Sequence, residues 1–158
     1  MTYQGSPNIV RRAIRTQTTK TNLYATQADK CQIDRIVMDS NWEAACAQTL
    51  EEMQEVFRYV RNEKLGFEVP YVDGSEEHHY RPDFIAVLDD GHGADDPLNL
   101  VLEVKGQRKP GDDAKHDTML RLWVPAINAI GRFGRWGFLR VDGPYGVDEE
   151  IRRRVLAS

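Results

Sequence analysis

Apolar side chains recur with a helical period in one long segment of the chain. Over residues 41–62 they follow one another at steps of three and four positions, and they are Trp42, Cys46, Leu50, Met53, Phe57 and Val60. This spacing places them on one face of a helix. Asp39 and Ser40 precede the segment, and Gly66 follows it at a position typical of a C-terminal cap. The pattern predicts one helix over about residues 41–62.

Shorter apolar runs in the rest of the chain predict β-strands. They cover about residues 31–38, 67–72, 83–88, 99–105 and 136–141. Gly, Asp, Pro and Ser are concentrated between these runs and predict loops at 73–79, 89–98 and 107–115. Segments 118–133 and 147–156 have helical character. Because helices and strands alternate, the sequence predicts one α/β domain over residues 31–158, preceded by a polar arm at 1–30.

The composition of the chain is that of a globular protein, with 41% hydrophobic and 29% charged residues. It excludes a disordered or collagen-like chain. No uninterrupted apolar run approaches the roughly 18 residues of a membrane span, so we expect a cytoplasmic protein without one. Cys31 and Cys46 have no CxxC spacing, and we expect them to be reduced packing residues.

Charge is unevenly distributed within a net charge of −4. Residues 1–103 carry 10 Lys and Arg against 18 Asp and Glu, whereas residues 104–158 carry 11 against 7. A basic region of an acidic protein can still attract a polyanion such as DNA, because the local potential steers the encounter. Mixed surface charge without a polyanionic partner is the alternative at this stage.

Two charged side chains interrupt an otherwise apolar strand. Alternation within the segment 99–105 puts Glu103 and Lys105 on the same face. Burying such charges costs free energy unless they pair with each other or with an ion. Asp83, directly after Pro82, begins the preceding strand, and a hairpin would bring it next to Glu103.

This placement of two carboxylates predicts a divalent metal site. Asp83 and Glu103 offer the hard oxygen ligands that Mg²⁺ or Mn²⁺ prefers, and the carbonyl of Val104 would supply a third oxygen. Lys105 would then hold or deprotonate the attacking water, or balance charge that develops on a phosphate. An ordinary Glu–Lys pair at a strand end is the alternative, and the position of Asp83 favours the metal site.

Glu43 is a further candidate, on the predicted helix. It shares the buried stripe with Cys46, Ala47 and Leu50, so its carboxylate is directed inward, toward a metal site or a lysine. The pattern Ser40-x-x-Glu43 also fits a capping box, in which the glutamate reaches back to the first amide of the helix. Both roles stay open.

These residues resemble the PD-(D/E)xK nuclease motif, with Asp83 in YRPDFIAVL and with Glu103 and Lys105 in LVLEVKG. Together with DSNWE, YVRNEKLGFEVPY, WVPAIN and FGRWGF, about residues 31–141 resemble the C-terminal endonuclease domain of type III restriction enzyme Res subunits and their DEAD/DEAH-helicase-linked relatives. The resemblance implies a restriction-endonuclease-like α/β fold, with a central mixed β-sheet flanked by helices, and Mg²⁺-dependent hydrolysis of double-stranded DNA. Asp83 and Glu103 match the metal ligands, Lys105 the catalytic lysine and Glu43 the helix glutamate.

The resemblance also implies partners. Res subunits carry an ATPase motor ahead of the nuclease, but this sequence has no GxxxxGK[ST] motif of such a motor. We therefore expect either a separate helicase or ATPase motor together with a methyltransferase subunit, or a nuclease module that belongs to a longer chain. Gln107 and Lys115 are candidates for contacts with DNA phosphates. An inactive DNA-binding or subunit-docking module is the alternative function, and RNA as substrate and a homodimer stay open.

Overall fold

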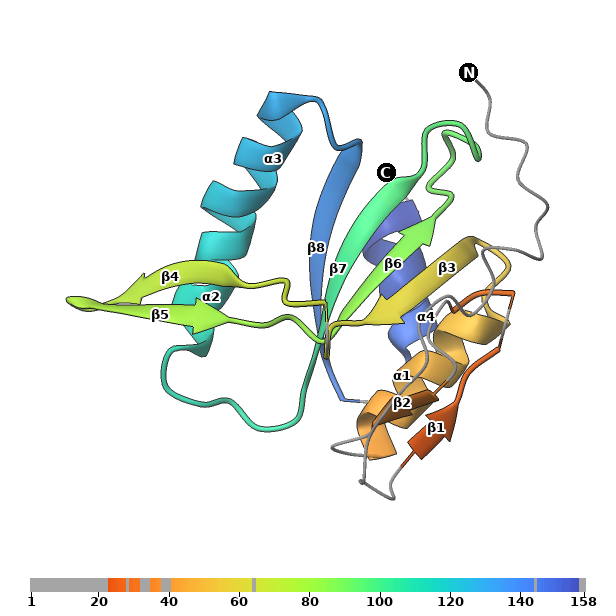
Figure 1. Ribbon diagram of the computed structural model, residues 1–158, viewed down its shortest axis with the longest axis horizontal. Helices are drawn as coiled ribbons and strands as arrows, with labels where there is room; N and C mark the ends of the chain where they lie inside the picture. Colours follow the sequence, from red (N-terminus) through yellow and green to blue (C-terminus); the bar gives the residue numbers. More distant parts are fainter. Residues whose placement is uncertain are drawn as a thin grey trace.

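A mixed four-stranded sheet forms the centre of the protein (Figure 1). The computed structural model describes residues 23–27, 29–31, 35–37, 41–63, 65–143 and 145–156. The strand order is β3-β6-β7-β8, with β3 at Val56–Arg61, β6 at Phe84–Leu88, β7 at Leu98–Lys105 and β8 at Arg135–Asp142. β6 is antiparallel to both of its neighbours, whereas β7 and β8 are parallel.

Helices cover both faces of this sheet (Figure 1). One face carries α1 (Asn41–Glu52), α4 (Val147–Ile151) and the π-helical turn η2 (Arg152–Leu156). The other face carries α2 (Asp112–Thr118), the π-helical turn η1 (Met119–Trp123) and α3 (Val124–Ile130). The predicted fold class, a central mixed sheet flanked by helices, is confirmed.

Each face of the sheet has its own buried apolar cluster. The cluster beneath α1 and α4 includes Leu50, Phe84 and Leu102, whereas the cluster beneath α2 and η1 includes Val101 and Met119. Neighbouring residues of β7 therefore face opposite layers, as strand alternation predicts. Both cysteines are buried in the first cluster, as expected of packing residues.

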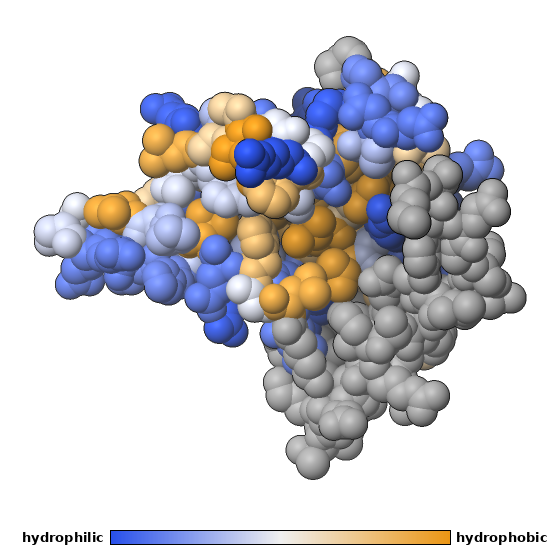
Figure 2. All heavy atoms as spheres, turned by 45° about the horizontal axis from the view of Figure 1, so that its top comes forward, coloured by the Kyte–Doolittle hydropathy of each residue, from blue (hydrophilic) through white to orange (hydrophobic). Residues whose placement is uncertain are grey.

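Two ribbons of two strands lie outside the central sheet. β1 (Leu23–Ala25) pairs with β2 (Arg35–Val37), and β4 (Val69–Asp73) pairs with β5 (Glu76–Tyr80). The β4–β5 hairpin extends away from the sheet (Figure 1), and its surface is mostly hydrophilic (Figure 2). Most of the predicted arm at 1–30 lies outside the described residues, and the boundary at residue 30 stays a prediction.

The predicted helix over residues 41–62 is wrong beyond Glu52. α1 ends there, and the second part of the segment is strand β3. Aromatic and β-branched side chains favour an extended strand there. A register shift between Val56 and Arg58 marks a bulge. Phe57 and Val60, which continued the helical stripe in the sequence, stand three positions apart across this bulged part of the strand, and Phe57 is 36% exposed. Gly66 accordingly follows a strand and caps no helix.

Two predicted loops also contain regular structure. The segment 73–79 includes most of β5, because Gly74 and Ser75 form a two-residue hairpin turn, with Gly74 at a φ of 64°. The segment 107–115 includes the start of α2 at Asp112. The strands predicted at 83–88, 99–105 and 136–141 and the helical segments at 118–133 and 147–156 are confirmed. Among the described helices none has the length and apolarity that crossing a membrane requires.

Candidate active site

The carboxylate of Asp83 is attached to the backbone of the neighbouring strand. β6 and β7 pair with Phe84 opposite Leu102, so the residue before Phe84 lies beside the end of β7. There the backbone N–H of Val104 donates a hydrogen bond of 2.8 Å to Asp83 Oδ2. On the other side, the N–H of Asn62 donates to the carbonyl of Asp83 at 2.8 Å. The side chain is therefore held at the strand end by its neighbours.

Glu103 and Lys105 project from the same end of β7. Glu103 is only 4% exposed, and its Oε1 lies 3.3 Å from the Lys105 ammonium. Its other oxygen, Oε2, is buried and has no hydrogen-bond partner among the described residues. Nearby, burial and then the charge of Glu103 raise the pKa of the Tyr80 phenol. A side-chain hydrogen bond between the two groups adds to this effect, so Glu103 lies between the Lys105 ammonium and the Tyr80 phenol.

The pKa of Asp83 is raised to about 6. Burial is the largest cause, and the negative charges of Glu103 and Glu43 add to it. The hydrogen bond from Val104 and the charge of Arg61 act in the opposite direction but do not compensate. The ionised form of Asp83 is therefore disfavoured first by burial and then by two neighbouring carboxylates.

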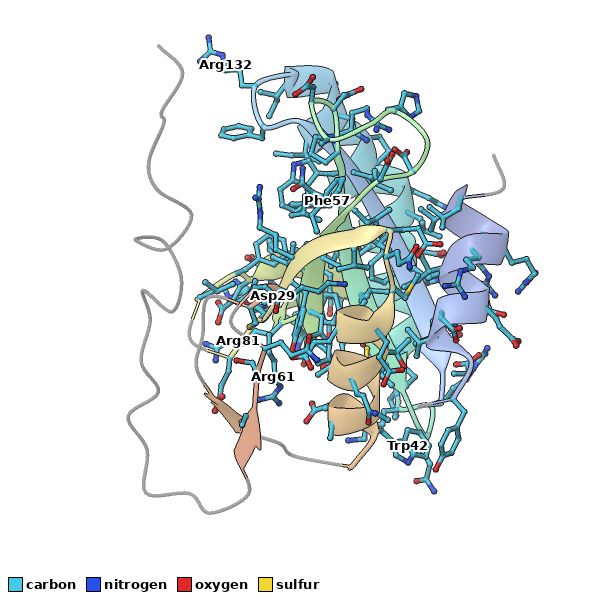
Figure 3. The ribbon with its side chains drawn as sticks, turned by 90° about the vertical axis from the view of Figure 1, so that its right-hand side faces the viewer. Asp29, Trp42, Phe57, Arg61, Arg81 and Arg132 are labelled. Carbon is cyan, nitrogen blue, oxygen red and sulfur yellow. The ribbon has the colours of Figure 1, made fainter. Side chains whose placement is uncertain are left out.

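Glu43 lies in the first turn of α1 and contacts Arg61. Its Oε1 accepts a hydrogen bond of 2.9 Å from Arg61 Nη2. A recess of about 220 Å³ is lined by both of these residues and by Asp83 and Arg81, and Figure 3 shows the two arginines close together. Glu43 therefore lies at the recess of Asp83 with an arginine as its partner, and its predicted catalytic role stays a prediction. The alternative capping box involves Ser40, which lies outside the described residues.

Asp112, at the start of α2, is a member of the site that the sequence did not reveal. It is 2% exposed, and its Oδ1 lies 2.9 Å from the Lys105 ammonium and 3.5 Å from that of Lys115. Its Oδ2 accepts a hydrogen bond of 2.6 Å from the N–H of Lys109. Burial opposes ionisation, but the bonds from Lys105 and Lys109 outweigh it and lower the pKa of Asp112 to about 2.

Lys105 is consequently held between two carboxylates. Burial opposes its charge, but the hydrogen bond to Asp112 and the charge of Glu103 outweigh burial and raise the pKa of the ammonium. An acidic residue in the first turn of α2 was the available signal for Asp112. It was missed because Gly and Pro in the preceding segment predicted a loop.

The two predicted phosphate contacts have different surroundings. The Lys115 ammonium lies over the rings of Tyr71 and Tyr80, at 5.8 and 5.7 Å from their centroids, in addition to its contact with Asp112. Gln107 is exposed just beyond β7. The structure thus brings Asp83, Glu103, Lys105 and Glu43 to one place, leaves Gln107 at its edge and packs Lys115 behind Asp112.

Within the described residues, no three His, Cys, Asp or Glu side chains form a ready metal-binding cluster. The groups available at the end of β7 are two carboxylates, of Asp83 and Glu103, and the backbone carbonyl of Val104. This is the donor set that the sequence predicted. Its role as a set of metal ligands stays a prediction.

A family model described as an endonuclease domain matches residues 29–121. The matched segment includes α1, the strands from β2 to β7 and all of α2, and so contains every residue of this site. No curated protein and no solved structure matches the chain. Because the family match covers more than half of the chain, the protein belongs to the endonuclease domain family, and its fold is restriction-endonuclease-like.

Proposed function

We propose that the protein hydrolyses phosphodiester bonds in double-stranded DNA with Mg²⁺ held at Asp83 and Glu103. The endonuclease domain family supports a nuclease. The observation that carries the rest is the hydrogen bond from Val104 to Asp83, because it holds one carboxylate at the strand end that bears Glu103 and Lys105. Mn²⁺ would substitute for Mg²⁺, since both ions prefer carboxylate oxygens.

The donor set at this strand end fits a hard divalent cation. Asp83 and Glu103 would supply carboxylate oxygens, and Val104 its carbonyl. Glu103 is buried at this strand end, and burial, followed by the charges of Glu103 and Glu43, raises the pKa of Asp83 beside it. The chemistry that a cation supplies at such a site is polarisation of a phosphoryl oxygen and a lower pKa for nearby water.

Lys105 provides the positive charge of the site. Its ammonium is held by Glu103 and Asp112, and its raised pKa keeps it protonated. We infer that it donates a hydrogen bond to the attacking water or to a phosphate oxygen, and that it stabilises the charge that develops there. Glu43 keeps Arg61 beside Asp83 and contributes to the negative charge of the site.

Plasmid cleavage tests this proposal. Supercoiled DNA is incubated with the purified protein in Mg²⁺, in Mn²⁺ and in EDTA. We expect nicked or linear products only with a metal. Lys105→Ala and Asp83→Asn should each lower the cleavage rate by about a hundredfold or more, the range for loss of a group that acts in the transition state. Asp95→Asn, on an exposed loop, is the matched control and should cut at the wild-type rate.

Calorimetric titration with Mg²⁺ separates the nuclease from the inactive binding module. Metal binding by the wild type and its loss in Asp83→Asn support the nuclease. DNA binding without metal binding supports the module. Wild-type cleavage by Asp83→Asn would remove the proposed site, and cleavage of RNA in preference to DNA would correct the substrate.

We further propose that this nuclease works in a type III restriction system, with a helicase or ATPase motor and a methyltransferase subunit. The proposal rests on the resemblance to Res subunits over about residues 31–141. Co-purification of the tagged chain from its source cells, followed by cleavage assays with and without ATP, tests it. A motor and a methyltransferase should co-purify, and ATP should accelerate cleavage only in their presence.

A further inference from the structure

An exposed tryptophan stands beside the proposed active site. Trp42 is the second residue of α1 and precedes Glu43. It belongs to the apolar stripe of the helix, yet it is 39% exposed, whereas Cys46 and Leu50 on that stripe are fully buried. In Figure 3 it lies at the lower end of α1, on the opposite side of the helix from Arg61. The core does not account for a large aromatic ring at this place.

The Trp42 ring packs on the backbone of Gly106, the residue after Lys105. A Cβ atom at position 106 would lie 2.6 Å from Cζ3 of the ring and 3.0 Å from Cη2. Gly106 is not one of the glycines with positive φ, so close approach of the ring, rather than backbone conformation, is what favours glycine here. The ring is therefore fixed against the end of the strand that carries Glu103 and Lys105.

An open recess of about 310 Å³ lies in front of this ring, lined by Trp42, Glu43, Val104 and Gly106. Glu43 also lines the recess that contains Asp83. The two recesses thus share a wall, one with carboxylates and the other with an aromatic ring and strand backbone. Val104, whose N–H binds the Asp83 carboxylate, also lines the recess of Trp42, so the aromatic ring and the carboxylates adjoin the same end of β7.

We propose that the Trp42 recess binds the base of the nucleotide next to the cleaved phosphate, with the base stacked on the indole ring. This inference rests on the proposed nuclease function. Aromatic rings bind bases by stacking without regard to sequence, because every base has a π-face. Inside a duplex both faces of a base are covered by its neighbours. The recess therefore selects DNA in which a base at the cut is unstacked, as at a mismatch or in a single strand, where extruding a base costs least.

Fluorescence titration in EDTA tests base binding without cleavage. The probes are a fully paired duplex and a duplex of the same sequence with one central mismatch. We expect the mismatched duplex to quench tryptophan emission and to bind about tenfold more tightly, the size of effect that stacking on one aromatic ring gives. Trp123 and Trp136 pack edge-on against each other in the other core cluster and should contribute little to the quenching.

Variants assign the effect to the recess. Trp42→Ala should abolish the quenching and the preference for the mismatch, and Trp42→Phe should restore the preference without the quenching. Gly106→Ala, which displaces the ring without removing it, should lose the preference as well. Phe133→Ala removes another exposed aromatic ring and should keep both effects. Thermal unfolding establishes that each variant is folded. If Trp42→Ala does not fold, the mismatch preference of Gly106→Ala decides whether the recess binds the base.

The outcomes distinguish this inference from the nuclease proposal. An unchanged mismatch preference in Trp42→Ala or Gly106→Ala, or no quenching of the wild type, overturns base binding even if the protein cuts DNA. Quenching that depends on Trp42 in a protein that cuts no DNA with Mg²⁺ supports base binding and removes the nuclease function. Tighter binding of the paired duplex overturns the selection of unstacked bases.

Discussion

Two aspartates of the site, the buried Asp112 and the half-buried Asp83, have opposite pKa shifts. Asp112 accepts hydrogen bonds from Lys105 and Lys109, and its pKa is lowered to about 2. Asp83 accepts one backbone hydrogen bond, but burial, and after it the charges of Glu103 and Glu43, raise its pKa to about 6. The ionised form of Asp112 stabilises the fold, whereas that of Asp83 destabilises it. A destabilising charge that persists is typical of a functional group.

Asp83→Asn should stabilise the metal-free protein at neutral pH. The folded pKa of about 6 exceeds the ordinary value of 3.8, so the native state retains its proton longer than the unfolded chain. Wild-type stability therefore falls as pH rises from about 4 to 6, and the variant should be more stable at pH 7 by up to about 3 kcal/mol. Urea unfolding in EDTA measures the difference, which should vanish below about pH 4. Equal stability at pH 7 would contradict the raised pKa.

Asp112→Asn should have the opposite effect. The pKa of Asp112 is lowered, so its contribution is present above about pH 4 and is lost as pH falls toward 2. At pH 7 the variant should lose about 2 kcal/mol of unfolding free energy. The same urea series measures it, with Asp95→Asn as control. An unchanged unfolding free energy would show that the ion pair of Asp112 with Lys105 does not stabilise the fold.

Pairing of β6 with β7 is what brings the site together. Both strands were predictable from the sequence, because short apolar runs bounded by Pro and Gly indicate strands. Alternation along β7 also assigns Glu103 and Lys105 correctly to one face of the sheet. The position of Arg61 was not predictable, because the bulge in β3 imitates a helical period. Asp112 was missed for a different reason: Gly and Pro before it predicted a loop, and its contact with Lys105 of β7 required the fold.

Phe84→Ala should test how far this strand pair depends on the core. The Phe84 side chain is fully buried against Tyr59, directly after Asp83. Truncation should cost about 3 to 5 kcal/mol, the range for a buried phenylalanine. Ile85→Ala, at the half-buried next position on the other face, should cost less. Urea unfolding compares the two, and equal losses would contradict the assignment of faces.

Net charge hides a basic segment next to the site. The chain has a net charge of −4, but Arg108 and Lys109 lie exposed in the loop that joins β7 to α2. This loop begins at Gly106, which lines the Trp42 recess. The charge asymmetry was readable from the sequence. The place of this loop beside the carboxylates follows from the end of β7 and needed the fold.

DNA affinity should accordingly depend on salt through this loop. Arg108→Ala and Lys109→Ala should each weaken binding at every sequence and reduce the slope of log affinity against log salt by about 1, as loss of one phosphate contact does. Fluorescence anisotropy at several salt concentrations in EDTA measures the slope. Arg153→Ala, in η2 and paired with Glu150, should leave it unchanged. Equal slopes for all variants would contradict DNA contact by this loop.

The hydrogen bond from Val104 to Asp83 also has a spectroscopic consequence. Its donor is a main-chain amide proton and its acceptor is a carboxylate with a pKa of about 6. The NMR resonance of that amide should therefore move with the ionisation of the side chain. The position of this one peak in a nitrogen-15 spectrum would then report protonation of Asp83, cation binding and substrate binding. No probe would have to be attached at the site.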